Sequence, residues 1–118
     1  MTCDAAGVSS VSDLQALRDR MRAFAAERQW HSYHDPKSVI LALVGEGGEL
    51  AELFQWLPAD SARELALDEP LRTRAGEEIS DVLLYLVLLA DVLGIDLAAA
   101  ANAKLSEAVT RYPPGIDP

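Results

Sequence analysis

The sequence has very little cysteine, and this scarcity limits the chemistry that the chain can carry. Cys3 is the only cysteine in 118 residues, which excludes an internal disulfide and a cage of thiolate metal ligands. The longest apolar run, residues 82–90, is about half of the roughly 20 residues that a membrane helix needs. Residues 1–12 have neither a basic start nor an apolar segment. We therefore expect no secretory signal, no membrane partner and a cytoplasmic location.

Positive charge is also scarce. Lys and Arg number 10 against 19 Asp and Glu, which gives a net charge of −9. This balance argues against binding to polymeric nucleic acid or to an anionic membrane. A nucleotide ligand remains compatible with it, because a divalent cation can supply positive charge locally.

The strict alternation of apolar and polar residues that is typical of strands is missing as well. We predict an all-α fold in a single domain of residues 12–113, flanked by tails at residues 1–11 and 114–118. Half of the residues are hydrophobic, which is ample for a folded core. The main helices are expected at residues 12–30, 37–57, 70–94 and 97–109, with a helical turn at 61–67.

Local signals support these helix boundaries. Ser12 and Gln15 have the spacing of a capping box. Asp35 precedes Pro36 as an N-cap precedes a first-turn proline. Gly94 is placed to end one helix, and Asp96 is placed to begin the next.

Apolar side chains recur at helical spacing in the two central helices and should face the core. The stripe of the second helix consists of Val39, Leu43, Gly47, Leu50, Phe54 and Leu57. The stripe of the third helix consists of Val82, Leu86, Leu89 and Leu93. Gly47 and Gly48 weaken the second helix by roughly 1 kcal/mol each relative to Ala, which indicates a close approach to the backbone or a bend.

Four carboxylates stand where such helices normally place core residues. Glu46 and Glu49 form one i, i+3 pair, and Glu78 and Asp81 form another, so each pair shares a helix face. Surface pairs with this spacing are common, but both of these pairs lie on the apolar side of their helices. An unpaired buried carboxylate costs several kcal/mol, which predicts a bound cation.

The oxygen donors of the four acids predict which cation would bind. Carboxylate oxygens suit a hard ion such as Mg²⁺, with Mn²⁺ as a substitute, and antiparallel helices would place all four acids around one or two ions. No histidine falls on these faces, which disfavours zinc. The chain also lacks a P-loop motif and a Ser or Cys nucleophile with a partner histidine. Metal-assisted hydrolysis is the reaction class that remains.

The segments around the acids resemble a known family. Gly45-Glu46-x-x-Glu49-Leu-Ala-Glu-Leu-Phe-Gln-Trp56 and Glu78-x-x-Asp81-Val-Leu-x-Tyr85-Leu are similar to the MazG-like all-α nucleoside triphosphate pyrophosphohydrolases, and most similar to their dCTP pyrophosphatase branch. The resemblance covers about residues 14–113. It implies a four-helix bundle that forms homodimers or homotetramers, and hydrolysis of a nucleoside triphosphate to the monophosphate and pyrophosphate. It also implies that the four acids hold Mg²⁺.

An oligomer is expected on physical grounds too. Residues 82–89 are apolar on almost every side of their helix, and a helix of this kind needs more cover than four short helices provide.

Residues near the acids are candidate substrate contacts. Trp30 and Trp56 suit stacking on a base, with ordinary core packing as the alternative. Tyr85 shares a face with Glu78 and Asp81, so its hydroxyl could contact a phosphate.

Three basic or titratable residues are further candidates. Lys104 suits phosphate binding, although it could equally be a solvated surface lysine. Arg111 is a second candidate cation, or it complements the C-terminal end of its helix. His34 is either a substrate contact or an exposed loop residue.

The chain departs from related sequences at three positions. Met21 lies nine residues before Trp30, where related sequences often have a histidine. Ser38 follows Pro36-Lys37, where they commonly have an asparagine. Ala108 lies four residues after Lys104, where they commonly have another asparagine. These differences affect recognition of base and sugar and leave the metal ligands intact. The alternatives to dCTP are dUTP or a broad set of nucleotides, and the non-enzymatic alternative is a metal-stabilised helical assembly module.

Overall fold

The computed structural model describes residues 12–115, and all regular structure in that range is helical. This confirms the all-α prediction. The expected N-terminal tail, residues 1–11, and residues 116–118 of the expected C-terminal tail, 114–118, lie outside the described residues. The elements are α1 (Asp13–Glu27), the 3-10 helix η1 (His31–Tyr33), α2 (Pro36–Glu52), α3 (Ala62–Ala66), α4 (Leu71–Val92) and α5 (Leu97–Arg111).

The predicted helix caps are present. The Ser12 hydroxyl accepts a hydrogen bond from the Gln15 N–H at 3.1 Å, and the Gln15 side chain accepts one from the Ser12 N–H at 3.1 Å. The Asp96 carboxylate accepts from the Ala99 N–H at 3.1 Å at the start of α5. Gly94 has a φ of 68°, a conformation that costs glycine little. These local interactions set where α1 and α5 begin and where α4 ends.

Several helix ends differ from the prediction, and α1 ends at Glu27 rather than near residue 30. The second helix was expected to reach residue 57, but α2 ends at Glu52 because the chain tightens into i→i−3 hydrogen bonds from Leu53 to Leu50 and from Phe54 to Ala51. Pro58 follows and disfavours a helical conformation in the residue before it. In contrast, α5 continues past residue 109 to Arg111.

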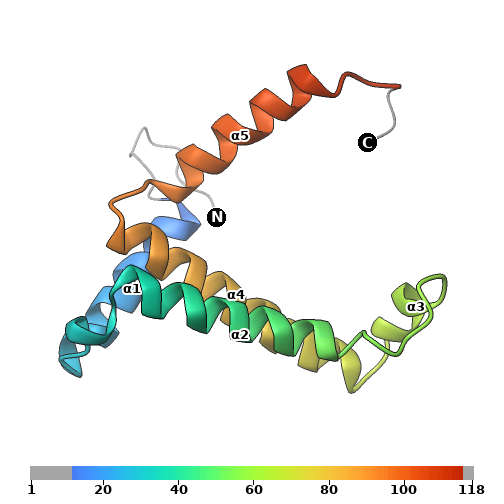
Figure 1. The fold of residues 1–118 in the computed structure, drawn as a ribbon, viewed down its shortest axis with the longest axis horizontal. Coiled ribbons are helices and arrows are strands. Elements are labelled where there is room, and N and C mark those ends of the chain that lie inside the picture. Colours follow the sequence, from blue (N-terminus) through green and yellow to red (C-terminus); the bar gives the residue numbers. More distant parts are fainter. Residues whose placement is uncertain (1–11, 116–118) are drawn as a thin grey trace, which may run out of the picture.

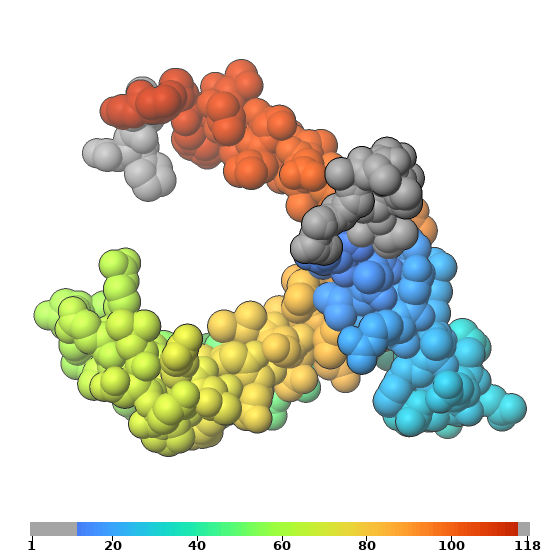
Figure 2. All heavy atoms as spheres, turned by 180° about the vertical axis from the view of Figure 1, so that it is seen from behind, coloured from blue at the N-terminus to red at the C-terminus, as the bar shows by residue number. Residues whose placement is uncertain are grey.

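The packing centres on α4. Helices α2 and α4 lie side by side and run in opposite directions, and α1 contacts the C-terminal half of α4 (Figure 1). Helix α3 lies near the N-terminal end of α4. Helix α5 makes a 103° bend with α4 and projects away from the other helices (Figure 1). In the space-filling view, α3 and α5 form the two ends of an open, C-shaped body (Figure 2).

The buried core is small. Among the described residues, the buried apolar side chains are Ala25, Val39, Ala75, Val87 and Ala90. The radius of gyration is 17.8 Å, whereas a compact domain of this length has a value of about 13 Å. The described part of one chain therefore leaves much apolar surface uncovered.

The buried face of α4 differs from the predicted stripe. Leu86 is 40% exposed and Leu93 is 51% exposed, while Val87 and Ala90 are buried. The helix is apolar almost all round, so the sequence alone does not single out one face. Residues of α1 line pockets together with Val87 and Ala90, and this packing decides which side of α4 is covered.

Among the described residues, no single helix is long and apolar enough to cross a membrane. Only α4 and α5 taken together meet that test by length and composition, and the bend of 103° separates them.

Candidate metal centre

The acidic side chains of α2 and α4 come together in the middle of the helix pair. Glu46, Glu49 and Glu78 each offer a carboxylate oxygen, and these three oxygens lie within 4.8 Å of one another. The i, i+3 spacing places Glu46 and Glu49 on one face of α2, and the antiparallel packing brings Glu78 of α4 opposite them. The expected convergence of acids from two helices is therefore present for these three residues.

Two oxygens in this cluster are buried and unsatisfied. Glu46 Oε2 and Glu78 Oε2 have no hydrogen-bond partner among the described residues. A buried polar atom without a partner is costly, and such atoms need a specific explanation. An all-oxygen donor set of carboxylates fits Mg²⁺ or Mn²⁺, so a divalent cation would satisfy both atoms at once. Glu46, Glu49 and Glu78 are the residues that would hold it, with Asp81 beside them.

Two acids of the cluster, Glu46 and Glu78, have raised pKa values. A hydrogen bond with the Glu49 carboxyl, burial, and the charges of Glu49, Asp81 and Glu78 together raise the pKa of Glu46 to about 7. Burial, followed by the charges of Glu49 and Asp81, raises the pKa of Glu78. The cluster thus holds protons at a pH at which isolated carboxyls have lost them.

Asp81 and Tyr85 lie next to the cluster on α4. The Asp81 side chain is exposed, yet it is close enough for its charge to raise the pKa of both Glu46 and Glu78. Tyr85 is half-buried and lies one helical turn beyond Asp81 on the same face of α4. These positions keep both residues as candidates for contact with a ligand of the cluster.

The structure does not bring the two tryptophans together. Trp30 precedes η1, is 43% exposed and packs edge-on against Phe24 with ring centroids 5.5 Å apart. Trp56 follows the other end of α2 and is 85% exposed. Because the 17 residues of α2 span about 25 Å, one chain does not present both rings to one base. The exposure of Trp56 also excludes ordinary core packing within the described chain.

The two predicted phosphate-binding cations lie on α5, away from the acids. Lys104 Nζ is 3.8 Å from Glu107 Oε1, and Arg111 forms an ion pair with the same carboxylate. Since α5 projects away from the α2–α4 pair (Figure 1), neither cation is grouped with the acid cluster.

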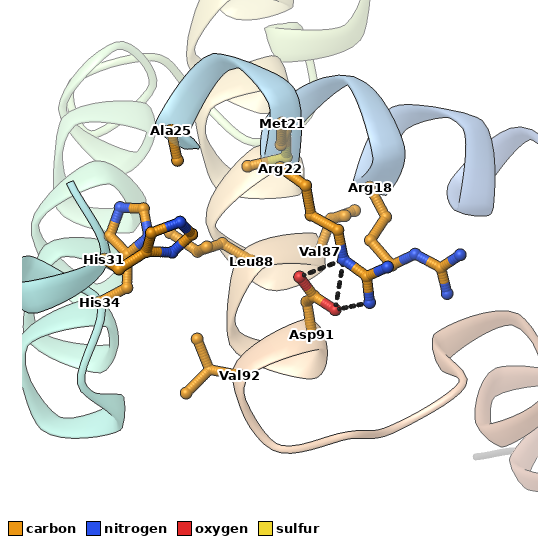
Figure 3. A pocket seen from close by; sticks show the side chains of 10 residues that line it. All are labelled: Arg18, Met21, Arg22, Ala25, His31, His34, Val87, Leu88, Asp91 and Val92. Atoms are coloured by element: carbon orange, nitrogen blue, oxygen red, sulfur yellow. Dashed lines mark hydrogen bonds and ion pairs between the residues drawn. The ribbon is translucent and has the colours of Figure 1, made fainter. Parts of the chain in front are cut away.

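His34 lines a pocket and is not part of the acid cluster. This pocket lies between α1, η1 and the C-terminal half of α4 and has a volume of about 230 Å³. Its lining residues are Arg18, Met21, Arg22, Ala25, His31, His34, Val87, Leu88, Asp91 and Val92 (Figure 3).

The sequence analysis missed the ion pair in this pocket. Arg22 Nε donates to Asp91 Oδ2 at 3.0 Å and to Oδ1 at 3.2 Å, which ties α1 to α4 (Figure 3). An available signal was Asp91 itself, a single acid in the otherwise apolar end of the third predicted helix.

The fold is found in a solved protein. A crystal structure of a pyrophosphatase from Archaeoglobus fulgidus matches with a TM-score of 0.79 and 34% sequence identity, and the match covers 90% of this chain and 97% of that chain. The MazG-like family model matches residues 45–115, which include all four acids. The chain therefore belongs to the MazG-like family.

Curated relatives are similar over most of this chain. It is 45% identical over 105 residues to a protein of Bos taurus named dCTP pyrophosphatase 1, covering 89% of this chain and 62% of the relative. It is 44% identical over 100 residues to the Homo sapiens protein of the same name, covering 85% and 59%. The chain thus spans about three fifths of the length of these relatives.

The raised pKa values predict how the stability of the metal-free protein depends on pH. The pKa of Glu46 is 4.5 in the unfolded chain and about 7 in the folded one, so the folded state binds more protons between these values. Its stability should therefore fall as the pH rises from 4.5 to 7 and level off above that. The lowered pKa values of Asp35, Glu69 and Asp91 make stability rise with pH in a more acidic range, so they oppose this trend only near its acidic end.

Thermal unfolding in the presence of a chelator, measured across this pH range, checks the prediction. Glu46→Gln should flatten the profile, whereas Glu52→Gln, on the exposed side of α2, should leave it unchanged. A wild-type profile that rises with pH over this interval would contradict the assignment. Added Mg²⁺ should raise the unfolding temperature most at the alkaline end, where the acids are ionised.

Proposed function

We propose that the protein is a Mg²⁺-dependent nucleoside triphosphate pyrophosphohydrolase that acts on dCTP or a modified dCTP. Water adds to the α-phosphorus, the bond from that phosphorus to the bridging oxygen breaks, and pyrophosphate leaves with the bridging oxygen. The second product is the nucleoside monophosphate. A role in removing unwanted deoxynucleotides from the nucleotide pool follows from this chemistry.

The observation that carries the proposal is the pair of buried, unpartnered oxygens of Glu46 and Glu78 inside a cluster of carboxylates. A purely structural cluster would be expected to satisfy these atoms with donors from the chain. Three converging acids with Asp81 beside them instead repel a triphosphate unless positive charge is bound between them.

The chain contributes positioning and proton transfer to this reaction. A bound Mg²⁺ would polarise phosphoryl oxygens and favour deprotonation of water. Glu46, Glu49, Glu78 and Asp81 would hold the ion, and one of these carboxylates would accept the proton of the attacking water. Tyr85, one turn from Asp81, would orient a phosphate oxygen through its hydroxyl.

The names of the curated relatives support dCTP as the substrate. Met21, Ser38 and Ala108 replace residues that related sequences commonly have, and this keeps dUTP or a broader set of nucleotides as the second candidate. A pyrophosphate-release assay over all nucleoside and deoxynucleoside triphosphates distinguishes them. Absence of turnover across that set would favour the alternative of a non-catalytic helical assembly.

We also propose that the chain works as a homo-oligomer. Its small core, its large radius of gyration and the exposed apolar residues of α5, Leu105 and Val109, leave surfaces that a second copy would cover. An oligomer also resolves the separation of the two tryptophans, because Trp56 of one copy could stack on a base bound beside Trp30 of another. Lys104 and Arg111 of one copy would likewise reach a phosphate bound at another copy.

Removal of a metal ligand should abolish turnover without unfolding the helices. Glu49→Ala and Asp81→Ala should each lower kcat by at least about 100-fold, because the ion acts mainly on the transition state. Glu52→Ala is the matched control on the exposed side of α2 and should retain activity. Steady-state kinetics with Mg²⁺, together with circular dichroism, provide the measurement. Full activity in both acid variants would refute the site.

The bond that is cleaved can be identified with isotopic water. Hydrolysis of dCTP in ¹⁸O-labelled water should place the label in the nucleoside monophosphate, since water adds to the α-phosphorus. Mass spectrometry of both products shows which of them carries the label. Label found only in pyrophosphate would mean attack at the β-phosphorus and would contradict the proposed arrangement.

A charge on the exposed apolar face of α5 should dissociate the oligomer. Leu105 and Val109 are 65% and 63% exposed and lie one turn apart on one face. Leu105→Glu or Val109→Glu should therefore lower the mass measured by light scattering, whereas Ala103→Glu, on the opposite face, should not. A wild-type protein that is a stable monomer at micromolar concentration would contradict the proposal.

A further inference from the structure

The pocket between α1, η1 and α4 has the chemistry of a site for a flat heterocycle. Its walls include Met21, Ala25, Leu88 and Val92, which are apolar. Its volume of about 230 Å³ equals the share of roughly eight water molecules in the liquid. A pocket with apolar walls and a few fixed polar groups is the usual form of a small-molecule site.

One face of α4 connects this pocket to the acid cluster. Asp81, Tyr85, Leu88 and Val92 follow at spacings of four, three and four residues, so they lie in one row along the helix. Asp81 is at the acid cluster, while Leu88 and Val92 line the pocket. From Asp81 to Leu88 the helix rises about 10 Å. A nucleoside whose α-phosphate lies at the acids can therefore place its base in the pocket.

The carboxylate of Asp91 is the acidic group among the polar side chains that line the pocket. Its side chain is 21% exposed, and the hydrogen bonds and charge of Arg22 lower its pKa, so it is ionised at neutral pH. An ionised carboxylate only accepts hydrogen bonds and has about four acceptor positions, of which Arg22 takes up to three. In Figure 3 the rings of His31 and His34 stand on one side of the pocket and Asp91 on the other.

We infer that Asp91, held in place by Arg22, selects a base that carries an exocyclic amino group at this position, and so favours cytosine over uracil or thymine. The inference rests on the proposed function and adds to it a residue that determines specificity. The 4-amino group of cytosine donates to the free acceptor position of Asp91. Uracil and thymine present a carbonyl oxygen at the same place, which leaves two acceptors facing each other without a hydrogen bond.

The test is the ratio of kcat/KM for dCTP to kcat/KM for dUTP. Asp91→Asn should lower this ratio about tenfold or more, because the amide can hold Arg22 with its oxygen and turn its NH₂ donor to the base. Asp19→Asn is the control: Asp19 also lies 3.8 Å from Arg22, but it does not line the pocket, and the ratio should stay at the wild-type value. Arg22 acts by positioning Asp91, so Arg22→Gln should lower the ratio as well.

If the ion pair had a purely structural role, the result would differ. Asp91→Asn would then lower the unfolding temperature and reduce turnover of both substrates equally, with the ratio unchanged. A second measurement uses the wild-type protein alone: an analogue of dCTP with hydrogen in place of the 4-amino group should lose about tenfold or more in kcat/KM.

The outcomes separate the two proposals. A wild-type protein that hydrolyses triphosphates but has the same kcat/KM for dCTP, dUTP and the analogue overturns the role of Asp91 alone. An unchanged ratio in a folded Asp91→Asn variant does the same. A wild-type protein that hydrolyses no nucleoside triphosphate overturns the proposed function and this inference together.

Discussion

The repulsion among Glu46, Glu49, Glu78 and Asp81 is the interaction that the packing of this chain has to overcome. A hydrogen bond with Glu49 at Glu46 and burial at Glu78, together with the charges of the neighbouring acids, raise the pKa values of Glu46 and Glu78. These raised values oppose folding of the metal-free chain at neutral pH. Packing of α2 against α4 must supply enough favourable energy to hold the acids there. The apolar face of α2 around Val39 does so by facing α4, and Arg22 with Asp91 fastens α1 to the same helix. Apolar packing and an ion pair outside the acid cluster thus hold the acids in place.

The features that could be predicted from the sequence are those set by local interactions and by spacing. The capping box at Ser12, the cap at Asp96 and the glycine at 94 involve residues within a turn of one another, and each lies where the pattern indicated. The convergence of Glu46, Glu49 and Glu78 was predictable for a similar reason. Two i, i+3 pairs on apolar faces leave few arrangements except one in which the faces meet.

The features that could not be predicted depend on which surfaces meet. Residues 82–89 are apolar on almost every side, so periodicity could not show that Val87 and Ala90 would be buried while Leu86 stayed exposed. The ion pair of Arg22 and Asp91 joins residues 69 positions apart, and no local pattern pairs them. The direction of α5 is set by the turn after Gly94, and the 103° bend there separates Lys104 from the acids.

Charge balance connects these observations. Under the proposed function, a triphosphate would bring several negative charges to a chain whose net charge is already −9. The two cations predicted to bind phosphate, Lys104 and Arg111, both pair with Glu107 on α5. Arg22 is neutralised by Asp91 in the same manner. The described chain therefore has its candidate cations in internal pairs and its acids in an unneutralised group. Within one chain, positive charge at the acids therefore comes from a bound cation, so under the proposed function the affinity for a triphosphate depends on that cation.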